Sequence, residues 1–234
     1  MKGEETYLSV DFAERLRRNN GPHARRHRRD RILDTAFRLF YAYGPRGVGV
    51  DTVIAESGVA KATLYKHFPR KDDLVLAYLD KVDQAWSGAL RAAAAAAGDD
   101  ARAQLVGMFD ALGGACRREG YHGCAFINTA AESAAGSPVH ARTVAHKNAV
   151  RAWVTDLARQ AGAAGRSLAR QLTLLLDGGL AAGVLDGDPA VADAAKRSAR
   201  ALVDAALRER CGGPSSTGGV KRALPYSLAG CGAI

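Results

Sequence analysis

The stretch that most constrains this chain is residues 50–68, which reads VDTVIAESGVAKATLYKHF. Asp51 is a good N-cap residue, so we expect a short helix over residues 52–57. Gly58 follows, where a helix cap often needs the positive φ that glycine adopts at little cost. A second short helix is expected from about Lys61 onward. Two short helices joined by a glycine turn predict a helix-turn-helix.

The second of these helices has two unlike faces. Leu64 and Phe68 share one face at a spacing of i, i+4, which predicts that this face is buried. A helix this short is not stable alone, so neighbouring helices must hold it and leave its other face free. The residues on that other face are Lys61, Ala62, Tyr65 and Lys66, with Thr63 at the edge.

That free face has the chemistry of a DNA reader. A helix fits the major groove, where each base pair shows a distinct pattern of donors and acceptors. Lysines can neutralise phosphates or donate to guanine, and hydroxyl groups can bond phosphates. The candidate DNA contacts in this stretch and just after it are Thr52, Lys61, Ala62, Thr63, Tyr65, Lys66, His67 and Lys71.

The charge of the chain favours a polyanionic partner. The formal net charge is +9, and eight arginines lie between residues 15 and 31 with a single acidic residue among them. These arginines either form a solvated basic tail or contact nucleic acid. Since they directly precede the predicted reading motif, we favour contact with nucleic acid.

Composition also narrows the class of protein. Alanine is abundant and aromatic residues make up 6%, which favours an all-α fold. No apolar run reaches the roughly 20 residues of a membrane span, and no signal-peptide core follows the basic N-terminus. The four cysteines form no CxxC pair, which argues against a zinc site and fits a cytoplasmic protein.

Apolar periodicity predicts the order of helices. A first helix over 29–43 carries Ile32, Ala36, Leu39, Phe40 and Tyr43 on one face, and Gly44-Pro45 ends it. A long helix over 71–97 is expected to link two lobes. Five more helices are expected over 100–119, 124–135, 138–162, 166–183 and 189–210, the last capped by Asp188.

These patterns divide the chain into four parts. They are a basic arm over 1–27 with a possible helix at 7–16, a helix-turn-helix domain over 28–75, a helical body over 76–210 and a loose tail over 211–234.

Residues 28–78 resemble the DNA-binding domain of the TetR-type (TetR/AcrR) bacterial regulators. The resemblance rests on Tyr43-Gly44, on IAESGV over 54–59, on KATLYKHF over 61–68 and on KDDL over 71–74. Ile54 departs from the pattern, because many members have alanine there. In some relatives an arm reaches the minor groove, which makes Arg25, Arg26, Arg28 and Arg29 further candidates.

The resemblance implies a C-terminal helical bundle that dimerises through its last two long helices and holds a small-molecule pocket. Ligand binding then releases a repressor from its operator; repressor rather than activator is implied by the family alone. The implied partners are double-stranded operator DNA, a second copy of the chain and an effector whose identity the sequence does not disclose. The residues that we expect at the pocket are Trp86, Phe109, Leu112, Cys124, Phe126, Asn128, Trp153 and Leu176.

The sequence leaves several interpretations open. Apolar residues of the last two helices, among them Leu168, Leu172, Leu180 and Val203, form either a dimer interface or an intramolecular core. Cys124 is either a small buried residue or a thiol sensor of the kind known in some similar repressors. The alternative function is a small-molecule or thiol-reactive sensor without a significant DNA role. We expect no cofactor, no metal and no enzymatic activity, since no GxSxG elbow or usual ligand spacing is present.

Overall fold

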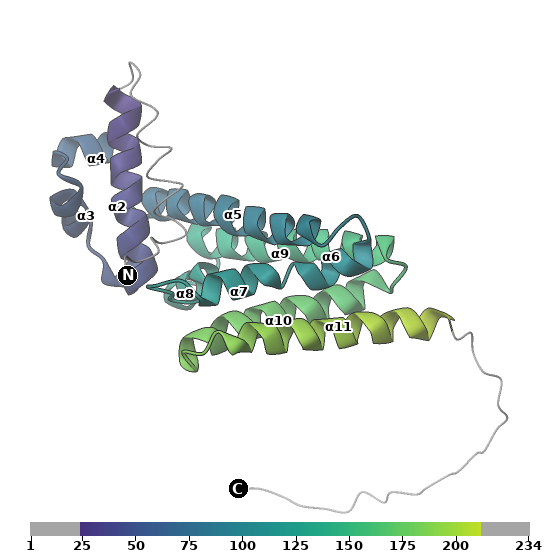
Figure 1. The fold of residues 1–234 in the computed structure, drawn as a ribbon. Coiled ribbons are helices and arrows are strands. Elements are labelled where there is room, and N and C mark those ends of the chain that lie inside the picture. Colours follow the sequence, from purple (N-terminus) through teal and green to yellow (C-terminus); the bar gives the residue numbers. More distant parts are fainter. Residues whose placement is uncertain (1–23, 212–234) are drawn as a thin grey trace, which may run out of the picture.

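A computed structural model of the chain describes residues 24–211, and these form helices and no strand. The fold class is therefore all-α, as the sequence predicts. Residues 1–23 and 212–234, which include most of the predicted arm, its possible helix and the tail, lie outside the described residues. Figure 1 shows a group of three helices at one end of an elongated helical body. They are α2 (Ala24–Gly47), α3 (Val50–Ser57) and α4 (Lys61–His67).

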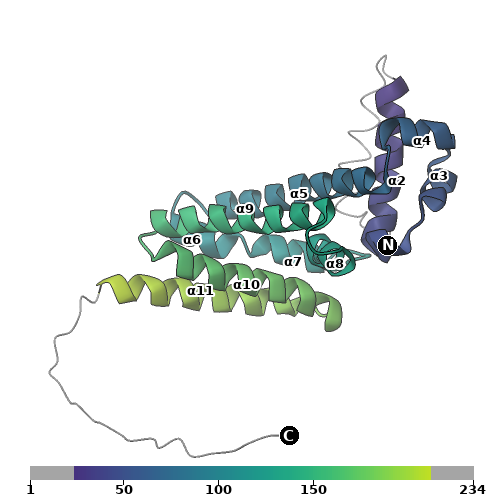
Figure 2. The ribbon, with the colours of Figure 1, turned by 180° about the vertical axis from the view of Figure 1, so that it is seen from behind.

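Seven further helices build the body. Helix α9 packs against α5, α6, α8 and α10, and α11 covers α6, α7 and α10 (Figure 2). The helices run roughly along the long axis of the body, and α2 stands across it (Figure 1). Their bounds are α5 Lys71–Ala96, α6 Ala101–Gly107, α7 Asp110–Cys116, α8 Ala125–Glu132, α9 Pro138–Gln160, α10 Gly165–Leu185 and α11 Ala190–Cys211.

Helix α2 carries the predicted apolar face with one exception. The predicted face residues Ile32, Ala36, Leu39 and Phe40 are at most 3% exposed, whereas Tyr43 is 70% exposed and does not join them. The helix starts at Ala24, five residues before the predicted start, and its regular part ends at Gly44 (φ 75°) as predicted.

Helix α5 joins the three-helix group to the body. Its first turns bury Leu74 and Tyr78 against α2, and the Tyr78 ring meets Phe37 and Phe40 edge-on, with centroids 5.6 Å apart in each pair. One apolar core consequently runs from Ile32 in α2 to Val203 in α11. A shift of the body against α5 therefore reaches α2 through packed side chains.

Two further predicted helix bounds differ from the structure. The single helix predicted over 100–119 is divided into α6 and α7 around the buried residues Met108 and Phe109. Gly107 lies so close to α5 that a Cβ would be 2.5 Å from that of Ala97. Helix α3 begins at Val50 with Gly49 as its N-cap, so Asp51 lies in the first turn instead of capping it.

The apolar residues of the last two helices that were candidates for a dimer interface are buried in the structure. Leu168, Leu172, Leu180 and Val203 are buried inside this single chain, because α6, α7 and α9 cover that side of α10 and α11. They form intramolecular core. The large apolar side chains of α10 that remain exposed are Leu174 (63%), Val184 (45%) and Leu185 (84%).

Helix α10 is long and apolar enough, by length and composition, to pass for a membrane span, with a mean hydropathy of 1.3 over its most apolar window. The sequence reading did not anticipate this. The helix packs between α9 and α11 and supplies core leucines, so it is a core helix.

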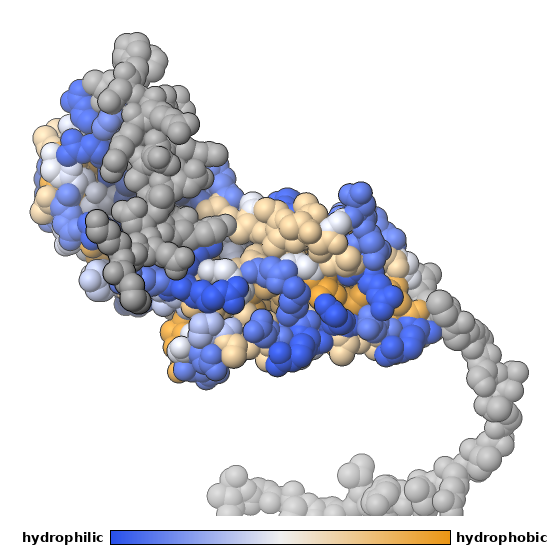
Figure 3. Space-filling view, viewed as in Figure 1, coloured by the Kyte–Doolittle hydropathy of each residue, from blue (hydrophilic) through white to orange (hydrophobic). Residues whose placement is uncertain are grey.

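Figure 3 shows mostly hydrophilic side chains where α7 and α11 face the viewer. Two ion pairs tie α11 to its neighbours in the body. Arg102 of α6 is 2.8 Å from Asp204, and Lys196 of α11 is 2.5 Å from Asp110 of α7.

Candidate functional site

The turn between α3 and α4 is held from three sides. Gly58 has φ 63°, and its N–H donates to the Ile54 carbonyl at 3.1 Å. Val53 and Ser57 are buried on the inner side of α3. The Arg31 guanidinium of α2 donates to the Ser57 carbonyl, where a cation is favourable because helix C-termini carry partial negative charge. The angle between the two short helices is thereby set by α2.

Helix α4 presents the faces that the sequence predicts. Leu64 and Phe68 are each 2% exposed. The Arg29 guanidinium of α2 lies 5.2 Å from the centre of the Phe68 ring, beside the C-terminal end of α4. The outward side chains are Lys61, Ala62, Tyr65 and Lys66, with Thr63 and His67 half-exposed.

The remaining candidate DNA contacts surround this face. Thr52 is exposed in the first turn of α3, Lys71 starts α5 half-exposed, and Arg28 is exposed on α2. The Lys61 ammonium is 3.3 Å from the Asp51 carboxylate, with both side chains mostly in water. Exposed ion pairs of this kind contribute little to the free energy of folding. Lys61 can therefore leave Asp51 to contact a phosphate.

A cavity lies where α2 meets the body. The volume open to the centre of a water-sized sphere is about 70 Å³. Its lining comes from α2, from α5, from the end of α7 with the loop that follows, from the start of α8 and from α10. The lining residues are Phe37, Tyr41, Val82, Ala85, Trp86, Ala89, Ala115, Arg118, Tyr121, Gly123, Cys124, Ala125, Phe126 and Leu180.

Three of the eight predicted pocket residues line this cavity, namely Trp86, Cys124 and Phe126. The other five do not. Phe109, Leu112 and Leu176 are packed in the core with at most 3% exposed. Asn128 is exposed and donates to the His122 carbonyl at 2.9 Å, and Trp153 lies in an open groove under the Arg91 guanidinium.

Sequence reasoning missed three polar residues of the lining. Tyr41 lies in the predicted helix-turn-helix domain and Arg118 near the end of the helix expected over 100–119, and neither was assigned to the pocket from the sequence. Tyr121 lies between two expected helices and shows no periodicity. Periodicity reports which face of a helix is apolar, but the contact between α2 and a loop some eighty residues away is not a periodic signal.

Both tyrosine hydroxyls of the lining are engaged. The Tyr41 hydroxyl donates to the Gly123 carbonyl and accepts from the His122 N–H, at 3.2 Å in each case. The Tyr121 hydroxyl donates to the Leu180 carbonyl at 2.8 Å. Burial raises the pKa of both phenols, so they stay protonated. Tyr41 also makes α2 part of the cavity wall.

Cys124 is the N-cap of α8 and is 8% exposed. The Lys147 ammonium of α9 lies 3.4 Å from its sulfur and pairs with the Asp177 carboxylate of α10 at 2.5 Å. The thiol therefore faces the cavity with a cation beside it. Among the residues that the structure describes, no group of three or more His, Cys, Asp or Glu side chains is arranged to hold a metal ion.

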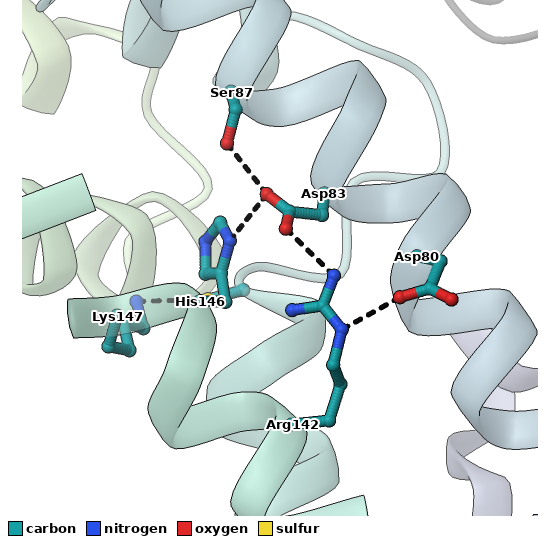
Figure 4. Close-up of polar contacts among 7 residues, drawn as sticks. Asp80, Asp83, Ser87, Arg142, His146 and Lys147 are labelled. Carbon is teal, nitrogen blue, oxygen red and sulfur yellow. Dashed lines mark hydrogen bonds and ion pairs between the residues drawn. The ribbon is translucent and has the colours of Figure 1, made fainter. Parts of the chain in front are cut away.

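A polar network joins α5 to α9 behind the cavity (Figure 4). The Asp83 carboxylate accepts from Ser87 at 2.7 Å, and from Arg142 and His146 at 2.8 Å each. Burial alone would raise the pKa of Asp83, but these hydrogen bonds outweigh it and lower the pKa to about 2. His146 is 1% exposed, and burial lowers its pKa. The His146 ring stacks on the ring of the cavity residue Phe126, with the two ring centroids 3.6 Å apart.

A second contact joins the body to α2. The Glu132 carboxylate at the end of α8 accepts from the Arg46 N–H at 2.7 Å. It lies directly on the turn that follows Gly44, where a Cβ would be 2.0 Å from Glu132 Oε1. The start and the end of α8 therefore both reach α2, through Tyr41 and through this turn.

A short exposed helix, braced by two others and carried on a larger helical body, is the arrangement of a helix-turn-helix protein with a second helical domain. Residues 32–78 match the family described as bacterial regulatory proteins, tetR family. The crystal structure of SCO4454, a TetR-family transcriptional regulator from Streptomyces coelicolor, is 38% identical with a TM-score of 0.68. That alignment covers 78% of this chain and 95% of SCO4454. A TetR regulator from Chloroflexus aurantiacus, 20% identical over 78% of this chain and 97% of its own, shares the fold with a TM-score of 0.69.

The curated relatives match over short stretches of the chain. LmrA of Bacillus subtilis, an HTH-type transcriptional regulator, is 49% identical over 41 residues, which are 18% of this chain and 22% of LmrA. The uncharacterized HTH-type regulator Rv1255c of Mycobacterium tuberculosis is 38% identical over 52 residues, or 22% of this chain and 26% of its own. The chain thus spans about a quarter of the curated relatives it matches. Taken with the match to SCO4454, these findings show that the chain belongs to the TetR family of transcriptional regulators, which implies DNA-binding regulation.

Proposed function

We propose that this protein is a homodimeric repressor that binds a roughly palindromic operator and leaves it when a small molecule enters the cavity. The observation that carries the proposal is the outward polar face of α4, held in place by α2 and α3. One helix makes few base contacts, so two copies about 34 Å apart, in successive major grooves, are needed for specificity. Arg28 and Arg29 would contact the DNA backbone from the start of α2.

Contacts between the cavity wall and α2 support control of the reading helix from the cavity. Its wall includes Tyr41 of α2, which bonds the loop before Cys124, and the far end of α8 holds the turn after Gly44 through Glu132. A ligand that displaces this loop would move α2 and, through Arg31, the turn between α3 and α4. The ligand shifts the equilibrium by its difference in affinity for the two arrangements.

The dimer would form on the side of α10 and α11 that the chain leaves uncovered. On α10, Leu174, Gly178, Ala181 and Leu185 recur at helical spacing and are all exposed. On α11, Ala194, Ala201 and the neighbouring Ser198 are exposed. Small residues allow two helices to approach closely, and the leucines supply apolar area. We propose this surface in place of the buried leucines that periodicity suggested.

A gel-shift assay with DNA from beside the protein's own gene tests the proposal. We expect retardation that weakens steeply with salt, because lysine and arginine contacts release counterions. Tyr65→Ala and Lys66→Ala should each weaken binding without lowering the unfolding temperature. Tyr43→Ala, at an exposed tyrosine away from α4, and Arg200→Ala, on α11, are the matched controls. Parent-like binding by both α4 variants would refute this recognition face.

A second candidate is a thiol-reactive sensor, and the contact of Lys147 with Cys124 favours it. An ammonium can hold the charge of a thiolate, which adds to electrophilic carbon. Treatment with N-ethylmaleimide should then release operator DNA from the parent and from Cys116→Ser, but not from Cys124→Ser. Equal release from all three proteins would reject the sensor. If instead no DNA is bound at any salt concentration while Cys124 still reacts, the sensor without a DNA role is favoured.

A further inference from the structure

The cavity concentrates aromatic side chains in a chain that has few of them. The sequence holds two tryptophans, seven tyrosines and six phenylalanines, and five of these fifteen residues line this one cavity. They come from four separate segments of the fold, namely α2, α5, the loop before α8, and α8. Flat rings pack favourably against the face or edge of another ring, at a gain beyond the area that they bury. The five residues are Phe37, Tyr41, Trp86, Tyr121 and Phe126.

Arg118 is the one charged side chain among the described residues of the lining, which include no carboxylate. It is half-buried and lies close enough to Tyr41 for its charge to act on that phenol. The hydroxyls of Tyr41 and Tyr121 each donate to a backbone carbonyl. A guanidinium presents a planar fork of donors that matches a carboxylate, and such charge-assisted bonds are strong.

The size of the cavity limits the ligand. A single water needs roughly 10–15 Å³ of the space open to its centre, so about 70 Å³ holds only a few waters. Cavities of drug-sized ligands are larger, at roughly 300–1,000 Å³ by the usual measures. A volume of this size favours a ligand no larger than a single ring with a small substituent.

We infer that the effector is a small single-ring aromatic acid, with its ring against Trp86 and Phe126 and its carboxylate on Arg118. This inference rests on the proposed function, since it names the class of molecule that acts at the proposed regulatory cavity. Bound there, the ring contacts Tyr41 and the loop that Tyr41 holds, which is the link between the cavity and α2.

The two tryptophans allow a direct test of binding without DNA. Trp153 lies in the open groove outside the cavity, so a Trp153→Phe protein keeps Trp86 as its single tryptophan. Its fluorescence is titrated with benzoate, with benzamide, which lacks the charge, and with cyclohexanecarboxylate, which lacks the aromatic ring. The same titrations are made with Arg118→Met, which keeps an apolar stem. Arg117→Met, at the exposed neighbouring arginine, is the control.

Benzoate should change the Trp86 fluorescence saturably, and Arg117→Met should bind it like the parent. Benzamide, and benzoate with Arg118→Met, should bind about tenfold to a hundredfold more weakly, the range of charge-assisted hydrogen bonds. Cyclohexanecarboxylate should also bind more weakly than benzoate. Three results would overturn the inference. Benzamide could bind as tightly as benzoate, or Arg118→Met could bind benzoate like the parent. The third is that benzoate does not bind up to about 10 mM.

Operator binding is measured separately with the same proteins in the gel-shift assay. Specific retardation of DNA that benzoate does not relieve, in a protein that does not bind benzoate, rejects the inferred ligand and leaves the regulator intact. Saturable benzoate binding without any specific retardation rejects the proposed DNA function and leaves the ligand class standing. The two failures are therefore distinguishable.

Discussion

Replacing Gly44 by alanine tests the contact between the regulatory body and the reading domain. Gly44 has φ 75° and ψ 149°, a region of backbone space that is essentially reserved for glycine and costs other residues about 1–3 kcal/mol. The new Cβ would also lie 2.0 Å from Glu132 Oε1, so the carboxylate would have to leave. Its hydrogen bond with the Arg46 N–H would be lost, at about 1 kcal/mol. We expect a total loss of roughly 2–4 kcal/mol in the free energy of unfolding.

Urea unfolding followed by circular dichroism measures this loss, and Gly47→Ala is the matched control. Within the described part of the chain, no heavy atom lies within 4 Å of a Cβ added at Gly47. That variant should change the free energy of unfolding by less than about 1 kcal/mol. A Gly44→Ala protein as stable as Gly47→Ala would refute the reasoning.

A double-mutant cycle separates the two parts of the loss. Glu132→Ala alone should cost about 1 kcal/mol, the value of its hydrogen bond. In the Gly44→Ala background, where the carboxylate has already been displaced, the same change should cost nothing or restore stability. Equal costs of Glu132→Ala in both backgrounds would show that the carboxylate does not lie on this turn.

Four further predictions concern the charged and apolar groups of the fold. Burial lowers the pKa of His146 below its usual 6.5, so the folded state binds fewer protons there and stability should fall as pH drops through 6.5. His146→Phe, which can keep the stack on Phe126, should flatten this step in pH-dependent thermal unfolding, whereas an unchanged profile would assign it to other groups. The pKa of Asp83 is lowered from 3.8 to about 2. The contribution of this carboxylate to the free energy of unfolding is therefore present above pH 3.8 and is lost as pH falls through about 2. The difference in stability between the parent and Asp83→Asn should shrink in that window. Leu174→Asp should convert a dimer to a monomer in sedimentation velocity while Val144→Asp, at a 44% exposed site on α9, should not. Asp51→Asn should strengthen operator binding a few-fold by freeing Lys61, and an affinity that does not rise would mean that Lys61 does not contact DNA.

The reading domain could be predicted from sequence because its determinants are local. Gly58 takes a positive φ that few other residues tolerate, and Leu64 and Phe68 mark the inner face of a helix by their spacing alone. Tyr43 shows the limit of such reasoning. It continues the apolar spacing of α2, yet its side chain is 70% exposed, so spacing alone did not show where the buried face ends.

The body was predicted less well because its determinants are contacts between distant segments. The break between α6 and α7 follows from the close approach of Gly107 to α5, which no window of sequence contains. The burial of Leu168 and Leu172 within one chain depends on where α9 lies, so an apolar face on α10 did not by itself distinguish a core from a dimer interface.

The sequence by itself determined the all-α class, the helix-turn-helix and the residues on the outer face of α4, since helical periodicity and glycine caps act within a few residues. Only the tertiary structure decided which side chains meet at the cavity. It brings Tyr41 of the reading domain together with Arg118, Tyr121 and Cys124 of the body. Contacts of this kind depend on how whole helices pack. The free energy of packing depends on shape and burial in three dimensions, which local sequence patterns do not specify.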